Sequence, residues 1–147
     1  MTESTSDGTL SIVLKNDSYE LERLSAALDD FADRHEMSDR ARFHLQLCLE
    51  EMVLNVINYG FDDEGEHEIH VEFRFHIDSR VVTVDILDDG REFDPLTQVP
   101  KPDTEAKLED RTVGGLGVHF VRTFMDEANY RHEGGKNRLT LTKNVGS

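Results

Sequence analysis

The sequence has few of the features that build disulfide frameworks or membrane spans. Its single cysteine, Cys48, lies between Leu47 and Leu49. No disulfide can therefore form within the chain, and Cys48 is expected to be buried as a small apolar residue. No apolar run approaches the roughly 18–20 residues that a membrane-spanning helix requires. We therefore expect a cytoplasmic protein with no membrane segment.

Positive charge is also scarce. The chain has 16 Lys and Arg residues against 31 Asp and Glu residues, which gives a formal net charge of -15. This balance opposes binding to a nucleic-acid backbone or to an anionic membrane. A phosphate ligand would instead need backbone N–H groups, a helix N-terminus or a bridging divalent cation. We therefore expect no direct nucleic-acid or membrane partner, and any anion site should be rich in glycine rather than lysine.

The hydrophobic periodicity predicts helices and strands in an α+β arrangement. Strands are expected at 9–15, 68–77 and 80–87 and in a hairpin that turns at 134–136; helices are expected at 19–37, about 40–59 and 114–125. A chain of 147 residues is the size of one domain, here 1–147 with a disordered polar tail at 1–8. This pattern predicts a two-layer α/β sandwich, with a mixed, mostly antiparallel sheet covered on one face by helices.

Two details of this prediction concern the ends of elements. Ser38 or Asp39 should cap the second helix, and Gly60 should end it. The alternation along 68–77 should turn one set of residues toward the helices: Ile69, Val71, Phe73, Phe75 and Ile77.

The second predicted helix carries a polar stripe. Within LCLEEMVLNVINYGF, Glu51, Asn55 and Asn58 stand at i, i+4 and i+7, so they share one face of a largely apolar helix. Burial of such groups without partners is costly. Either Glu51 and Asn58 are exposed and Asn55 bonds to a neighbouring backbone, or the stripe faces a ligand.

The stretch ILDDGREFDP follows the strand at 80–87. Strand parity places Asp88 on the same face as Ile86, at the edge of the core. There its carboxylate could accept a hydrogen bond from a buried amine such as that of a purine, and Gly90 would let a ligand ring approach the backbone. The alternative is a plain turn.

The stretch VGGLGVH opens the last predicted helix. Gly114, Gly115 and Gly117 would expose backbone N–H groups beside the positive end of the helix dipole, which suits a phosphate. No strand-led GxGxxG or P-loop pattern is present. The alternative is a flexible hinge. The preceding segment, 96–113, has no clear period and is expected to be a functional or mobile loop.

Taken together, these stretches resemble the Bergerat-type ATP-binding fold, and in particular the anti-sigma-factor serine kinases of the RsbW type. The resemblance covers about residues 9–143. It rests on Glu51-x-x-x-Asn55 with Asn58-Tyr59-Gly60-Phe61, on Asp88-Asp89-Gly90, and on Gly115-Leu116-Gly117. The chain departs from many members at Glu92, where a second glycine is common, and this leaves the backbone around Arg91 undetermined.

The resemblance implies binding of ATP and Mg²⁺. It makes Asn55 the Mg²⁺ ligand, Glu51 the general base and Asp88 the acceptor for the adenine amine. It makes 96–113 the ATP lid. The remaining residues implied at the nucleotide are Asn58, Gly90, Gly115, Leu116 and Gly117. Arg111 or Lys107 would supply a cation near the γ-phosphate, although a solvated loop charge is equally compatible with either residue.

The resemblance further implies a serine kinase that phosphorylates a STAS-type anti-sigma-factor antagonist and binds a sigma factor, commonly as a homodimer. The alternative is a nucleotide-binding partner-switch module without kinase activity. A histidine-kinase fragment is disfavoured, because no dimerisation helix with a phosphoacceptor histidine precedes the second helix. His44 lies on that helix itself and is expected to be an ordinary surface or boundary residue.

Overall fold

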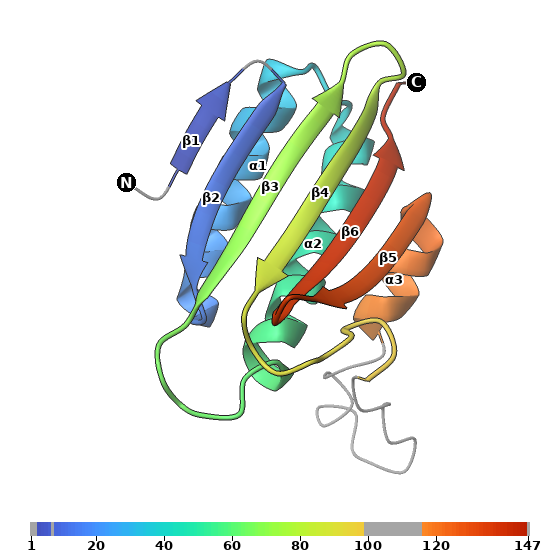
Figure 1. Cartoon of the computed structure of the whole chain (residues 1–147). Coiled ribbons are helices and arrows are strands. Elements are labelled where there is room, and N and C mark those ends of the chain that lie inside the picture. Colours follow the sequence, from blue (N-terminus) through green and yellow to red (C-terminus); the bar gives the residue numbers. More distant parts are fainter. Residues whose placement is uncertain (1–2, 7, 99–115, 147) are drawn as a thin grey trace, which may run out of the picture.

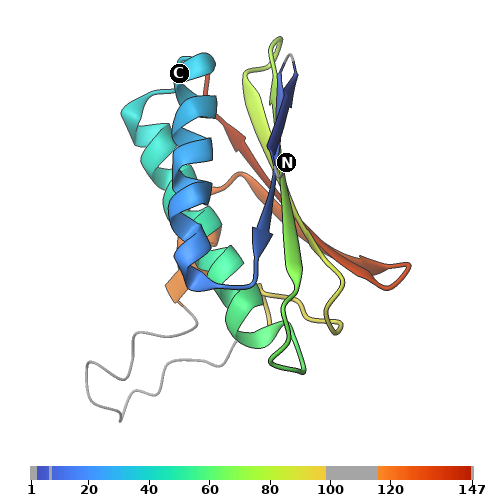
Figure 2. The same ribbon diagram turned by 90° about the vertical axis from the view of Figure 1, so that its left-hand side faces the viewer.

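The computed structural model describes residues 3–6, 8–98 and 116–146. They form two layers, a sheet and three helices packed on one of its faces (Figures 1 and 2). The strands are β1 Glu3–Ser6, β2 Thr9–Lys15, β3 Glu68–His76, β4 Val81–Asp88, β5 Glu127–Glu133 and β6 Lys136–Asn144. The helices are α1 Leu21–Arg34, α2 Asp39–Tyr59 and α3 Leu116–Phe124, and a short 3-10 helix, η1 Ser18–Glu20, precedes α1. No helix in these ranges is long and apolar enough to cross a membrane.

The sheet has the strand order β1-β2-β3-β4-β6-β5. Every neighbouring pair of described strands is antiparallel. The prediction of a mostly antiparallel sheet is therefore confirmed, but the predicted parallel component is absent from the described strands. The predicted α+β class with helices on one face is confirmed. The C-terminal hairpin adds to the sheet through β6, which pairs with β4 and places Asn137 opposite Asp88.

The structure differs from the sequence prediction at three places. Residues 3–6, which were expected in a disordered tail, form β1 along β2. Ile77, which was expected on the covered face, lies beyond the end of β3 in the turn to β4 and is 77% exposed. Tyr19 lies in η1 rather than in α1, because Asp17 accepts a hydrogen bond from the Tyr19 N–H and closes a short first turn.

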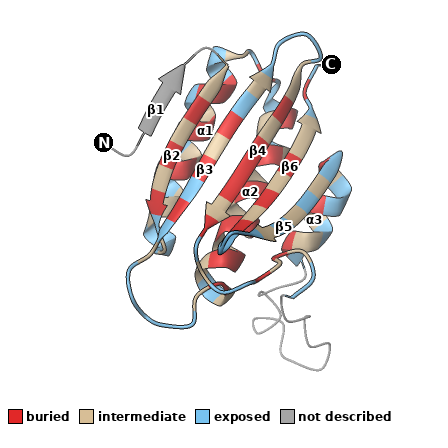
Figure 3. Cartoon of the chain, viewed as in Figure 1, coloured by how far each residue is buried: buried red, intermediate tan, exposed pale blue. Residues whose placement is uncertain are grey.

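The core lies between the sheet and the helices, and α2 contributes most to it from the helical side (Figure 3). The Ser38 side chain caps α2 by accepting a hydrogen bond from the Ala41 N–H. Cys48 is fully buried as predicted, and burial raises the pKa of its thiol to about 12. The buried apolar residues of α2 are Ala41, Leu45, Leu49, Met52, Val53 and Val56. These residues pack α2 against the core along most of its length.

Candidate functional site

The polar stripe of α2 divides into a buried part and an exposed part. Asn55 is 4% exposed, Glu51 is half-buried and Asn58 is exposed. The side-chain Nδ2 of Asn55 is buried and has no hydrogen-bond partner among the described residues. Such a group costs about 1–3 kcal/mol of folding free energy. The alternative in which Asn55 bonds to a neighbouring backbone therefore does not hold for its side-chain nitrogen. That N–H group can donate a hydrogen bond to a further partner.

Glu51 lies against the first turn of α3. A Cβ atom added to Gly117 would stand 2.8 Å from the Glu51 Cβ and 3.0 Å from its Oε2, so glycine permits this approach. Burial raises the pKa of the Glu51 carboxyl, and the neighbouring charge of Glu50 raises it further. A carboxylate with a raised pKa at a helix crossing is a suitable proton acceptor near neutral pH.

Asp88 ends β4 on the covered side of the sheet, as strand parity predicted, and is 6% exposed. Its Oδ1 accepts hydrogen bonds from the Gly90 N–H at 2.8 Å and from the Asn137 Nδ2 at 2.9 Å. Burial raises the pKa of this carboxyl, and the two hydrogen bonds oppose the rise. Both described donors use one oxygen of Asp88.

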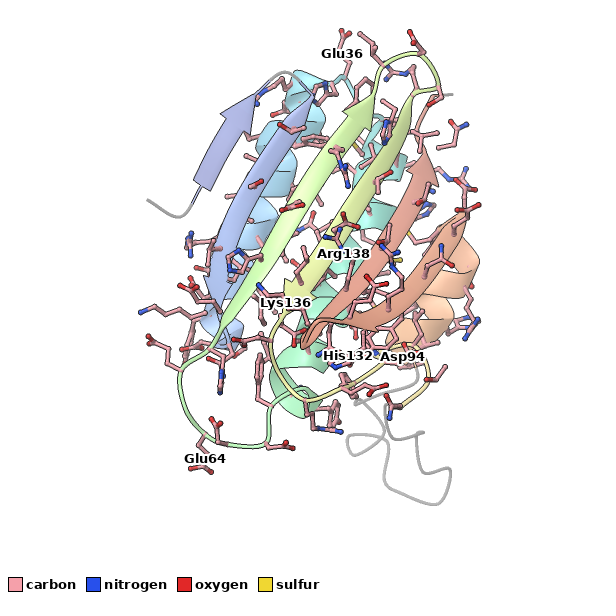
Figure 4. All side chains as sticks on the ribbon, viewed as in Figure 1. Glu36, Glu64, Asp94, His132, Lys136 and Arg138 are labelled. Carbon is pink, nitrogen blue, oxygen red and sulfur yellow. The ribbon has the colours of Figure 1, made fainter. Side chains whose placement is uncertain are left out.

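Asn137 joins Asp88 to the surrounding loop and strands. Its Nδ2 also donates to the Arg91 carbonyl at 2.7 Å. Its Oδ1 accepts from the Tyr130 hydroxyl and lies 3.1 Å from the His132 Nδ1. Figure 4 shows His132 near the β5–β6 hairpin, at the same end of the sheet as Asp94. Asn137 is 3% exposed, and the Asp88 carboxylate is thus oriented by a buried amide.

The sequence reasoning missed Asn137. The run NRLTLTK was placed in the C-terminal hairpin, and its first residue was not assigned to the site. The pairing of β6 with β4, which aligns Asp88 with Asn137, is a tertiary fact. The only available signal was a polar residue at a position that strand parity turns toward the core, in line with Leu139 and Leu141.

The turn after β4 is fixed to the C-terminal end of α2. A Cβ atom on Gly90 would stand 2.3 Å from the Gly60 carbonyl oxygen, and the Arg91 N–H donates to the same oxygen at 3.1 Å. The Arg91 guanidinium donates to the Tyr59 carbonyl at 2.6 and 3.0 Å. Gly90 therefore packs between the turn and α2. Its approach to a ligand ring stays a prediction.

The departure at Glu92 is followed by a buried aromatic residue. Phe93 is 2% exposed, and its N–H donates to the Asn137 Oδ1 at 3.3 Å. The Arg91 guanidinium lies 5.2 Å from the centroid of the Phe93 ring. The sequence left the backbone at Arg91 undetermined. In the structure its N–H donates to the Gly60 carbonyl and its carbonyl accepts from the Asn137 Nδ2, and these two bonds fix it.

Part of the predicted site is not described. Lys107, Arg111, Gly114 and Gly115 lie outside the described residues, as does most of the predicted lid. Leu116 begins α3 and is 48% exposed. The described site therefore consists of Glu51 and Asn55 on α2, Gly117 on α3, and the cluster around Asp88.

The described site offers acceptor oxygens at Asp88 on β4 and at Glu51 and Asn55 on α2. The side-chain oxygen of Asn55 is a type of ligand that Mg²⁺ accepts. No group of three or more His, Cys, Asp or Glu residues that could hold a metal occurs in the described part of the chain. A Mg²⁺ ion would therefore take most of its oxygens from the ligand and from water, and the residues present fit that mode.

The family model described as histidine kinase-like ATPase domain matches residues 14–143. The match spans the two layers and every described element of the site. The chain therefore belongs to the histidine kinase-like ATPase family.

Within this family, the chain is similar to serine kinases of the RsbW type. The chain is 36% identical to the serine/threonine-protein kinase BtrW of Bordetella bronchiseptica, over 78% of this chain and 79% of that protein. It is 29% identical to the serine-protein kinase RsbW of Listeria monocytogenes, over 93% of this chain and 86% of that protein. It is 27% identical to an anti-sigma F factor of a Thermoanaerobacter species, over 70% of each chain.

A solved structure shares the fold. The crystal structure of the RsbU and RsbW domains of a Mycobacterium tuberculosis protein matches with a TM-score of 0.64 at 16% identity. The match covers 93% of this chain and 32% of that longer chain. The likeness shows the two-layer fold alone.

Proposed function

We propose that the protein is an ATP-dependent serine kinase of a partner-switching circuit. It would phosphorylate a STAS-type antagonist of an anti-sigma factor and bind a sigma factor when that antagonist is phosphorylated. The observation that carries the proposal is the pair on one face of α2, in which a half-buried Glu51 with a raised carboxyl pKa stands one turn before the buried Asn55. The names of the relatives support a serine kinase and an anti-sigma partner.

Each residue receives a defined task. The Glu51 carboxylate accepts the proton of the serine hydroxyl, and the serine oxygen bonds to the γ-phosphorus of ATP. The bond between the γ-phosphorus and the β,γ-bridging oxygen breaks, and ADP leaves. The Asn55 oxygen would hold Mg²⁺, which would supply positive charge to offset that of the phosphates. Asp88 accepts a hydrogen bond from the adenine amine through the oxygen that Gly90 and Asn137 do not use. Gly117, with Asn58, Leu116 and the undescribed Gly115 and Arg111, would border the phosphates.

Replacement of Glu51 tests the kinase. Glu51→Ala should retain nucleotide binding and abolish phosphate transfer, because only the proton acceptor is lost. The measurement is incubation with labelled ATP, Mg²⁺ and candidate antagonist domains, with label scored on serine. Undiminished transfer by the variant would contradict the assignment.

Replacement of Asn55 tests the cofactor role. Asn55→Ala should weaken the binding of Mg-ATP, measured by calorimetry, by about tenfold or more, which is at least about 1.4 kcal/mol. In the presence of a chelator, the substitution should change the affinity for ATP less, because Asn55 acts on ATP through the cation. An unchanged affinity for Mg-ATP would remove Asn55 from the metal site.

The alternative is a nucleotide-binding partner switch without a kinase step. A wild-type chain that binds ATP and exchanges partners, but labels no serine, would favour that function. We further propose a cytoplasmic homodimer, because the uncovered face of the sheet is available to a second copy (Figure 2).

A further inference from the structure

A concave surface lies at the end of the helical layer away from Asn55. It is a cavity of about 530 Å³ between the start of α2, the end of α3 and the last residues of β6. Arg40, His44, Phe124, Asp126 and Lys143 are among its lining residues. None of these belongs to the nucleotide site.

The cavity concentrates positive charge in a strongly acidic chain. Arg40 and Lys143 line it together with His44, whereas Asp126 is the single acidic lining residue. One Asp126 oxygen accepts the Asn144 N–H at 2.5 Å and the carboxylate keeps its charge, so the lining holds two fixed cations against one anion. Burial lowers the pKa of His44, and the charges of Lys143 and Arg40 lower it further, so the imidazole is neutral at pH 7 and the positive charge of the cavity comes from Arg40 and Lys143. A chain of net charge -15 thus presents a local cationic site.

An apolar surface adjoins these cations. Phe43 is 61% exposed although it belongs to a helix of the core. The His44 ring stacks on Phe124, with centroids 3.9 Å apart and an interplanar angle of 12°. Phe120 follows at 6.3 Å from Phe124. Aromatic residues beside arginine are typical of the buried centre of a protein interface.

The cavity is separated from the nucleotide site along both helices. From Arg40 to Asn55 α2 advances about 22 Å at 1.5 Å per residue. On α3, Gly117 meets Glu51 at one end, and the Phe124 carbonyl accepts a hydrogen bond from the Lys143 Nζ at 2.8 Å at the other. A molecule bound at the cavity would leave the nucleotide site accessible.

We propose that this surface docks a segment of a partner protein in which a carboxylate side chain stands beside an aromatic or large aliphatic one. The carboxylate pairs with Arg40 and Lys143 inside the cavity, and the apolar side chain covers Phe43. A free inorganic anion would satisfy the cations and leave Phe43 exposed. Charge complementarity and the exposed ring together therefore favour a peptide segment. The proposal is independent of the kinase step.

Selection of peptides from a random displayed library against the full-length protein tests the proposal. Each round is counter-selected on the double variant Arg40→Glu, Phe43→Ser. The selected peptides should combine Asp or Glu with Phe, Tyr, Trp or Leu. Their binding should shift the amide NMR resonances of residues 40–44, 123–126 and 143–145.

Single variants then locate the contact. Arg40→Glu and Phe43→Ser should each weaken peptide binding by about tenfold or more, measured by fluorescence anisotropy. Arg34→Glu and Tyr19→Ser are the matched controls, since Arg34 is an exposed α1 arginine and Tyr19 is 86% exposed in η1. Both controls should bind as wild type does.

Three results would overturn the proposal. The first is a failure to enrich any peptide, and the second is enrichment of peptides that bind the two α2 variants as tightly as wild type. The third is that inorganic phosphate shifts the same amide resonances and that the peptides bind no more tightly than phosphate does. That last result would define a small-anion site instead.

Discussion

The carboxylate of Asp88 illustrates how single residues of the site oppose folding. Its burial raises its pKa, so the ionised form is less favourable in the folded chain than in the unfolded chain. The contribution of such a group to stability is greatest below its unfolded pKa and is lost as the pH rises through its folded pKa. At neutral pH the charge of Asp88 therefore opposes folding, although hydrogen bonds from Gly90 and Asn137 offset part of this cost.

Asp88→Asn should consequently separate stability from binding. At neutral pH the variant should unfold at the same urea concentration as wild type or a higher one, because no charge is buried. Its ATP affinity should fall by about tenfold or more, since an amide N–H would face the adenine amine. Urea unfolding and calorimetry measure the two effects. A large loss of stability with unchanged ATP affinity would contradict this account.

Glu51 should set the acid limb of the kinase rate. The group works as an acceptor only when ionised, and its pKa lies above the ordinary glutamate value of 4.5. Single-turnover transfer should therefore decline on acidification with a midpoint above 4.5. Glu50→Gln removes a neighbouring negative charge and should move that midpoint to lower pH without abolishing transfer. A midpoint that Glu50→Gln leaves unchanged would argue against Glu51 as the titrating group, provided that circular dichroism shows folded protein.

At the scale of elements, the site depends on close approaches between secondary structures. The turn after β4 contacts the end of α2 through Gly90 and Gly60, and α3 contacts the middle of α2 through Gly117 and Glu51. Each approach excludes even one additional carbon atom. The helices are thus positioned by sterics as much as by hydrophobic burial.

Gly117→Ala should disturb the crossing of α3 over α2. Its Cβ would lie 2.8 Å from that of Glu51, so α3 must shift or Glu51 must change its rotamer. We expect a loss of about 1–3 kcal/mol in the free energy of unfolding and a lower transfer rate. Thermal unfolding and the transfer assay provide the measurements. Thr123→Ala, at an exposed position of the same helix, is the control and should retain both properties.

At the scale of the whole molecule, the sheet keeps one uncovered face. That face holds a buried carboxylate, Asp85, which accepts hydrogen bonds from Arg74 at 2.9 Å, Arg138 at 2.8 Å and Thr140 at 2.6 Å. Figure 4 labels Arg138 on β6. These hydrogen bonds join β3, β4 and β6 on the uncovered face. Half-buried Leu87 lies on the same side of β4 as Asp85.

The proposed homodimer through this face can be tested with Leu87→Glu. The added charge would be buried against the second copy, so the sedimentation coefficient should fall from that of a dimer to that of a monomer. Tyr19→Glu places the same charge at an exposed residue of η1 and should leave the dimer intact. A wild-type chain that sediments as a monomer would rule out the proposed homodimer.

The sequence was sufficient to predict much of the fold because the periods are local. Alternation placed the buried residues of β4 and put Asp88 on their face, although the strand itself ends one residue later than predicted. The cap at Ser38 and the breaker at Gly60 placed the limits of α2. Ile77 was placed wrongly, because alternation continued past the last residue that pairs with β4. The strand β1 has no apolar alternation to reveal it and is held by its pairing with β2.

The sequence by itself determined the components of the site: a carboxylate and an amide one helical turn apart, an aspartate in phase with a buried strand, and glycine at a helix start. These follow from spacing along one chain segment. Only the tertiary structure decided which groups surround them. Asn137 reaches Asp88 because β6 inserts beside β4, and Gly117 meets Glu51 because α3 crosses α2. Such contacts join residues distant in sequence, so their physical cause is packing, which local periodicity does not encode.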